Sequence, residues 1–126
     1  MTPEKFKETV NEMFTQCCDL LSLKEKDYSD GKDRLIQFKK AASLKGETPL
    51  DSLAGMMAKH TTKLYTMLED SRNGETFSEK QWEEVLNDHT NYLFLLKAVL
   101  MDEGNNAQFY KCTFEPNSNI SIDSII

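Results

Sequence analysis

Cysteine and histidine are scarce in this sequence, with three and two residues among 126. Cys17 and Cys18 are neighbours on a predicted helix, where their side chains point about 100° apart and do not readily form a disulfide. Cys112 stands alone, and neither a C-x-x-C motif nor a Cys/His cluster is present. The pattern excludes a disulfide framework and argues against a structural zinc site. We expect the thiols to behave as small buried hydrophobes.

Long apolar runs are also missing. No segment approaches the roughly 20 apolar residues that a membrane-spanning helix needs, and residues 1–5 contain no apolar core of a signal peptide. Hydrophobic residues make up 39% and charged residues 29% of the chain, as in a globular domain rather than a disordered chain. We therefore expect a cytoplasmic protein that does not bind membranes.

A concentrated basic surface is the third absence. The net charge is −6, and only residues 31–71 are positive, at +2, between flanking segments of −3 and −5. Because duplex-binding domains gather basic residues against phosphates, we expect no binding to duplex nucleic acid. The mildly basic middle suits one small anionic ligand. A Gly-rich phosphate loop, a nucleophile elbow and an H-E-x-x-H motif are missing too, so no common catalytic signature is present.

The chain contains four helical segments. Apolar residues recur at spacings of three and four, and turn residues at 27–31, 46 and 73–74 separate the segments. The predicted helices cover residues 3–24, 32–45, 49–70 and 79–103. This pattern predicts an all-α fold, an antiparallel bundle of about four helices in residues 1–104. We expect residues 105–126 to form a short extended or hairpin arm, packed on the bundle or on a neighbouring subunit.

The third and fourth helices have well-marked starts. Thr48 with Asp51, and Ser78 with Gln81, have the spacing of capping boxes. The centre of the fourth helix, residues 92–96, is apolar nearly all round, which predicts burial in the middle of the bundle or in a subunit interface. The expected apolar faces are Leu50, Leu53, Met57, Leu64 and Leu68 on the third helix, and Trp82, Leu86, Leu93, Leu96 and Leu100 on the fourth.

Polar residues lie on or beside both apolar faces. If the two helices pack antiparallel, cations from one oppose a carboxylate, an amide and an aromatic ring from the other, which suits a nucleotide. A second interpretation stays open, in which the histidines are core residues and the lysines a solvated flank. The residues concerned are Lys59, His60 and Lys63 on the third helix and Asp88, His89, Asn91 and Tyr92 on the fourth.

Several short segments between residues 24 and 101 resemble a group of small phage proteins with a "nucleotide modification associated" type 1 domain. The matching segments are Lys26-Asp27-Tyr28, residues 34–38, 56–60 and 82–84, and residues 88–93 with 95–97. That domain is itself similar to the all-α, MazG-like nucleoside triphosphate pyrophosphohydrolases. The resemblance implies an oligomeric all-α protein of phage or prophage origin, in the host cell cytoplasm, with a nucleotide between its helices. It adds Tyr28 and Arg34 to the candidate ligand-binding residues.

The sequence departs from the hydrolase pattern at its metal site. MazG-like enzymes use an E-E-x-x-E motif on one helix and E-x-x-D on the next. Residues 56–63 contain basic and apolar side chains but no acid, and the position that needs the acid of the second motif is Val85. Asp88 is retained.

Three functions remain open. We favour a non-catalytic nucleotide-binding protein that sequesters a nucleotide signal of host defence, with no cofactor. The second is a nucleoside triphosphate pyrophosphohydrolase of the all-α class, which would need magnesium. The third is an inhibitor that binds a host protein through the fourth helix and residues 109–126.

Overall fold

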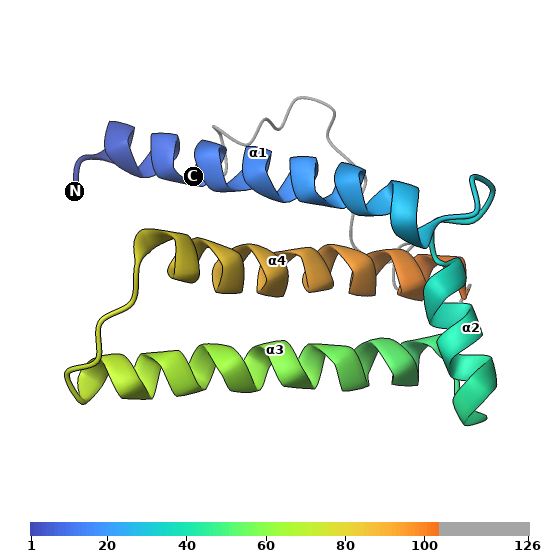
Figure 1. The fold of residues 1–126 in the computed structure, drawn as a ribbon. Coiled ribbons are helices and arrows are strands. Elements are labelled where there is room, and N and C mark those ends of the chain that lie inside the picture. The colour runs from blue at the N-terminus through green and yellow to red at the C-terminus, as the bar shows by residue number, and fades with distance from the viewer. Residues whose placement is uncertain (104–126) are drawn as a thin grey trace, which may run out of the picture.

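A computed structural model describes residues 1–103, which form four α-helices joined by short loops (Figure 1). The helices are α1 (Pro3–Tyr28), α2 (Ile36–Lys45), α3 (Pro49–Arg72) and α4 (Glu79–Asp102). The predicted all-α class is confirmed. The arm predicted at residues 105–126 lies outside the described residues. Within residues 1–103, no helix combines the length and the apolar character that a bilayer crossing requires.

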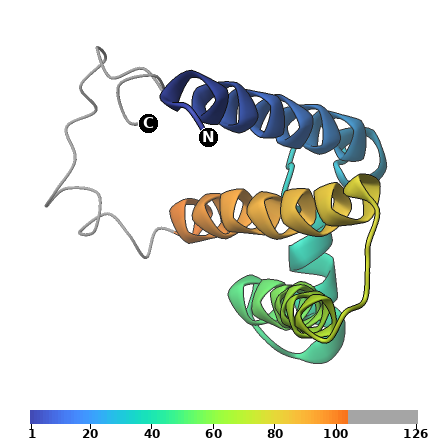
Figure 2. The same ribbon diagram turned by 90° about the vertical axis from the view of Figure 1, so that its left-hand side faces the viewer.

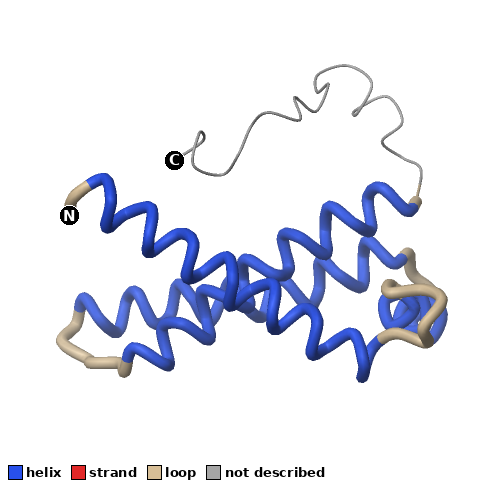
Figure 3. The backbone as a smooth tube through the Cα atoms, turned by 90° about the horizontal axis from the view of Figure 1, so that it is seen from above, coloured by secondary structure: helices blue, strands red, loops and turns tan. Residues whose placement is uncertain are grey.

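The three long helices form one layer with α4 in its middle (Figures 1 and 2). α4 packs against α3 on one side and α1 on the other, and the short α2 closes one end by packing on α3. α3 and α4 are antiparallel, whereas α1 runs in the same direction as α4 because the chain reverses twice between them. Seen from above, α1 crosses the other long helices at an angle (Figure 3).

Both predicted capping boxes are present. The Thr48 hydroxyl accepts a hydrogen bond from the Asp51 amide at 3.2 Å, and the Asp51 carboxylate accepts one from the Thr48 amide at 3.2 Å. Ser78 and Gln81 make the same pair of contacts at 3.1 and 2.9 Å. These bonds satisfy amide groups that the first turn of a helix leaves without partners, and they fix where α3 and α4 begin.

Two predicted helix boundaries were wrong, and both changes involve the loop between α1 and α2. α1 continues one turn past Lys24 to Tyr28, so Asp27 and Tyr28 belong to the helix and the turn begins at the C-cap Ser29. α2 begins at Ile36 rather than Lys32. The Asp30 carboxylate accepts the amides of Lys32 and Asp33 at 2.9 and 2.7 Å, so these groups bond to a side chain instead of starting a helix.

A cluster of buried apolar side chains lies between α2, α3 and α4 and is formed by Leu35, Phe38, Leu53 and Val99. The predicted face of α4 was wrong in part: Leu86 and Leu93 are 40% and 51% exposed, while Val85 and Asn91 are buried. A helix in the middle of a layer buries two opposite sides, so a single apolar stripe does not describe it. Leu68 on α3 is likewise exposed, and Met67 is buried in its place. Of the two described thiols, Cys17 is buried as expected and Cys18 is exposed.

Candidate functional site

A cavity of about 380 Å³ lies where all four helices and the α1–α2 loop converge. This volume is within the range of small-molecule sites, roughly 300–1,000 Å³. Its lining combines apolar, aromatic and charged side chains: Leu21, Lys24 and Tyr28 from α1, Arg34 from the loop, Gln37 and Phe38 from α2, Met56 and Lys59 from α3, and Asp88, Asn91, Tyr92 and Leu95 from α4.

Helical periodicity places the α1 and α4 residues on the cavity wall. Leu21, Lys24 and Tyr28 follow one another at spacings of three and four, so they share one face of α1. Tyr28 belongs to this face because α1 extends to that residue. The α4 residues repeat the same spacing between positions 88 and 95. Arg34 reaches back over the α1 residues, and its Nη2 donates to the Leu21 carbonyl at 3.4 Å.

A buried polar contact fixes the crossing of α1 and α4 next to the cavity. Asn87 Nδ2 donates a hydrogen bond to Gln16 Oε1 at 3.0 Å. On the same amide, Oδ1 lies 3.6 Å from the Cys17 thiol. Both Cys17 and Asn87 are buried. Since Leu21 and Lys24 lie one and two turns beyond Cys17, this contact sets where the α1 wall of the cavity stands.

Asp88 is the carboxylate of the lining, and a basic side chain lies near each of its oxygens. Lys24 Nζ lies 3.7 Å from Oδ1 and His60 Nδ1 lies 3.9 Å from Oδ2. Partial burial lowers the pKa of His60 below its ordinary value, Asp88 opposes this shift, and Lys24 and Lys63 add to it. At neutral pH the imidazole is therefore uncharged, and Lys24 is the cation that balances Asp88.

Tyr92 forms an aromatic wall that His60 supports. The two ring centroids are 4.5 Å apart and the rings are tilted by 34°. Burial raises the pKa of Tyr92, and the nearby Asp88 and Tyr28 raise it further, so the phenol stays neutral. Tyr28 contributes a second ring to the lining.

Asn91 is the most buried polar group of the lining, at 4% exposure. Neither its amide oxygen nor its amide nitrogen has a hydrogen-bond partner among residues 1–103. Buried amides nearly always have partners, so this one needs an explanation.

The structure brings six of the nine sequence-predicted residues into one lining: Tyr28, Arg34, Lys59, Asp88, Asn91 and Tyr92. His60 stands behind the lining, against Tyr92 and Asp88. Lys63 and His89 do not line the cavity, although both influence the pKa of His60.

Sequence reasoning missed Lys24 and Gln37, along with the apolar lining residues. Lys24 precedes Tyr28 by four residues, which places the two side chains on one helix face. This spacing could indicate Lys24 only if the predicted helix extended to Tyr28, as α1 does. Gln37 precedes the core residue Phe38, but nothing in the sequence distinguished it from an ordinary exposed helix residue.

Comparison with family models, curated proteins and solved structures found no match to this chain. In the described part of the chain, no three histidine, cysteine or carboxylate side chains gather where they would hold a metal ion.

Proposed function

We propose that this chain binds a nucleotide in the cavity between its four helices and holds it without hydrolysing it. The observation that supports the proposal is the composition of the lining, which has three cations, two tyrosines and two amides against one carboxylate. These groups come from α1, the loop after it, α2, α3 and α4. Few convergent polar groups on an apolar, aromatic wall are typical of small-molecule sites.

The cations Lys24, Arg34 and Lys59 suit the phosphates. They make the lining net positive in a chain whose overall charge is −6, so the cavity attracts an anion that the rest of the surface repels. Arg34 offers a planar fork that matches two phosphate oxygens, and the lysines act as point charges. Asp88 leaves Lys24 only partly neutralised, because the two groups are 3.7 Å apart and both partly exposed.

The aromatic residues suit the base. Tyr28 and Tyr92 provide ring faces, and stacking of one base on an aromatic side chain contributes about 1–3 kcal/mol. Leu21, Phe38, Met56 and Leu95 supply the apolar remainder of the wall.

The residues at the positions of the hydrolase motif favour binding of the nucleotide without its hydrolysis. Lys59 occupies the helix on which MazG-like enzymes keep their acids, and Val85 replaces an acid of the second motif. Together with the resemblance to phage proteins, this supports a role in sequestering a nucleotide signal of host defence. The alternative hydrolase makes the opposite prediction, namely product release that depends on magnesium.

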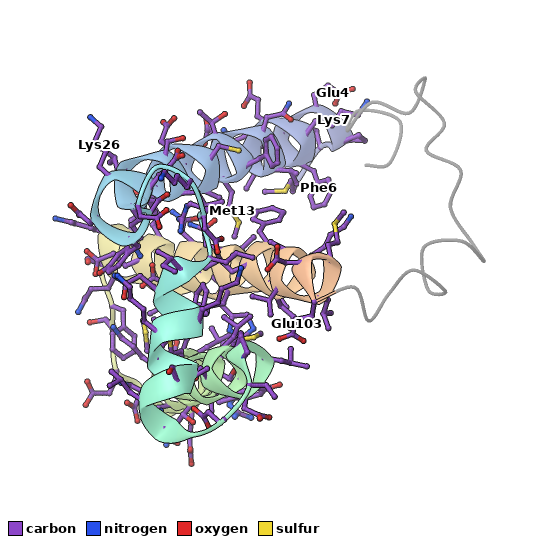
Figure 4. The ribbon with its side chains drawn as sticks, turned by 90° about the vertical axis from the view of Figure 1, so that its right-hand side faces the viewer. Glu4, Phe6, Lys7, Met13, Lys26 and Glu103 are labelled. Carbon is purple, nitrogen blue, oxygen red and sulfur yellow. The ribbon has the colours of Figure 1, made fainter. Side chains whose placement is uncertain are left out.

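We also propose that two copies of the chain associate with each other. Phe14 and Phe94 meet edge to face at 6.4 Å and are nevertheless 47% and 40% exposed. Phe6 and Met13 lie on the side of α1 toward α4 (Figure 4), and Phe6 is 46% exposed. A second copy of the chain would cover this surface, and light scattering on the full chain measures the mass directly. A monomeric mass with a tight complex to a host protein would favour the inhibitor instead.

Isothermal titration of the full chain against mononucleotides, cyclic dinucleotides and cyclic ADP-ribose-type molecules tests the proposal. We expect one class to bind and Lys59→Glu to weaken it at least about tenfold, since a hydrogen bond to a charged group contributes about 1.5–3 kcal/mol. Lys80→Glu is the matched control, because it makes the same charge change two turns from Asp88 on exposed α4 surface.

Mass spectrometry of the bound nucleotide, released by denaturation, separates binding from hydrolysis. An intact ligand is expected after incubation with magnesium. Turnover of nucleoside triphosphates with magnesium and none with a chelator would establish the hydrolase, and no binding across the panel would refute the proposed binding function.

A further inference from the structure

Among the described residues that line the cavity, Asp88 is the one acidic side chain. Its side chain is 32% exposed, so a ligand in the cavity can reach it. The basic atoms beside it are Lys24 Nζ, 3.7 Å from Oδ1, and His60 Nδ1, 3.9 Å from Oδ2. Both distances exceed the roughly 2.7–3.2 Å of an ordinary N–H···O hydrogen bond. Each carboxylate oxygen therefore keeps room for a hydrogen bond from a ligand.

The phosphates of a nucleotide do not suit this position. An ionised carboxylate only accepts hydrogen bonds, and phosphate oxygens are acceptors with the same sign of charge. Asp88 repels them, whereas the cations of the lining attract them. The group that Asp88 binds must instead donate hydrogen bonds. In a nucleotide these donors are the ribose hydroxyls and the N–H groups of the base.

The neighbours of Asp88 favour the ribose over the base. Beside Oδ1 stands Lys24, a cation that suits the phosphate. Beside Oδ2 stands His60, whose ring contacts the Tyr92 ring with the centroids 4.5 Å apart. Tyr92 also follows Asp88 by one helical turn, so the two side chains are neighbours on α4. The contacts therefore run from a phosphate-binding cation through Asp88 to a base-binding ring, which is the order of phosphate, sugar and base in a nucleotide.

We propose that Asp88 makes the cavity selective for ribonucleotides by accepting hydrogen bonds from the 2′- and 3′-hydroxyls of the ribose. This inference rests on the nucleotide-binding function proposed above and names the sugar that the site selects. Two vicinal hydroxyls present two donors side by side, which match the two oxygens of a carboxylate. Hydrogen bonds to a charged acceptor are stronger than those between neutral groups. A 2′-deoxynucleotide offers only one of the two donors.

Calorimetric titration of ribonucleotides and their 2′-deoxy forms tests the inference. The ligands are the 5′-monophosphates of adenosine, guanosine, cytidine and uridine, together with cyclic ADP-ribose. Each is compared with its 2′-deoxy form, so that the two members of a pair differ by one hydroxyl. In every pair that binds, we expect the full chain to bind the ribose form at least about tenfold more tightly, because the deoxy form leaves a carboxylate oxygen without its donor.

The variant Asp88→Ala separates a role in selectivity from a role in folding. Both members of a pair should bind to it equally, because the acceptor is gone. A 2′,3′-dideoxynucleoside 5′-monophosphate, which has neither donor, should bind to it more tightly than to the wild-type chain, since a negative charge that repels the phosphate is removed. A misfolded site would bind every ligand more weakly. Glu84→Ala is the matched control, because it removes an exposed carboxylate one turn earlier on α4 and should keep the preference.

Equal binding of the ribose and deoxy forms by the wild-type chain would overturn this inference and leave the nucleotide-binding function standing. A preference that persists in Asp88→Ala would do the same. So would binding confined to the cyclic dinucleotides, whose esterified ribose oxygens leave no vicinal diol. If no nucleotide of the panel binds, the proposed function fails as well.

Discussion

Replacing Asn91 with leucine should stabilise the ligand-free protein, the opposite of what a core substitution normally does. Asn91 is 4% exposed with both amide atoms unpartnered among residues 1–103. A buried polar group without a partner costs about 1–3 kcal/mol, and leucine removes that cost at similar size. For a domain of this length, 1 kcal/mol corresponds to roughly 4 °C, so we expect Tm to rise by roughly 4–12 °C.

The matched control is Asn87→Leu, one turn away on the same helix and 5% exposed. It removes the hydrogen bond donated to Gln16 at 3.0 Å and the contact with Cys17, leaving Gln16 Oε1 without its donor. We expect a loss of about 1–3 kcal/mol. Two chemically identical substitutions should therefore change the stability in opposite directions.

Urea unfolding of both variants without ligand measures the effect, with an unchanged slope showing that the same transition is compared. If Asn91→Leu destabilises the protein as much as Asn87→Leu, the amide is structurally satisfied and the reasoning fails.

Three further outcomes follow from the same geometry. Lys59→Glu should weaken nucleotide binding more than Lys63→Glu in titrations, because only Lys59 lines the cavity. The folded-state pKa of His60 is lowered, so its contribution to stability is complete above the unfolded pKa of about 6.5 and is lost as pH falls through the folded value. His60→Gln should flatten that acid-side decline in urea unfolding measured from pH 7.5 to 5. Ser78→Ala should lower the unfolding free energy by about 0.5–2 kcal/mol, since it removes the bond to the Gln81 amide at 3.1 Å.

Local signals predicted the helices well because the determinants of helix starts are themselves local. Thr48, Asp51, Ser78 and Gln81 act within four residues of one another, and both capping boxes formed as expected. The loop before α2 was mispredicted for a related reason. The carboxylate of Asp30 accepts hydrogen bonds from two backbone amides that would otherwise belong to a helix. Helix propensity alone does not show which acidic side chain binds the backbone in this way.

The faces of the helices were harder to predict than their existence. Leu86 and Leu93 fit an apolar stripe at helical spacing, yet both are largely exposed because α4 sits between two partners. Lys24 could not be assigned to the site for a comparable reason, since its role depends on where α1 crosses α4. Six candidate residues nevertheless meet in one cavity. The antiparallel packing of α3 and α4 brings four of them together, Lys59 with Asp88, Asn91 and Tyr92, and α1 with its following loop adds Tyr28 and Arg34.

The α1–α4 crossing makes the cavity depend on residues that do not line it. Cys17 and Asn87 hold the two helices together, and Lys24 extends from the next turns of α1 to Asp88 at 3.7 Å. A weaker contact at Cys17 would shift Lys24 and Tyr28 together, since both belong to one continuous helix. Phosphate and base contacts on α1 would then weaken in parallel. Cys17→Ala, which removes the thiol from this fully buried position and with it the contact to Asn87, should thus reduce the affinity for every nucleotide by a similar factor.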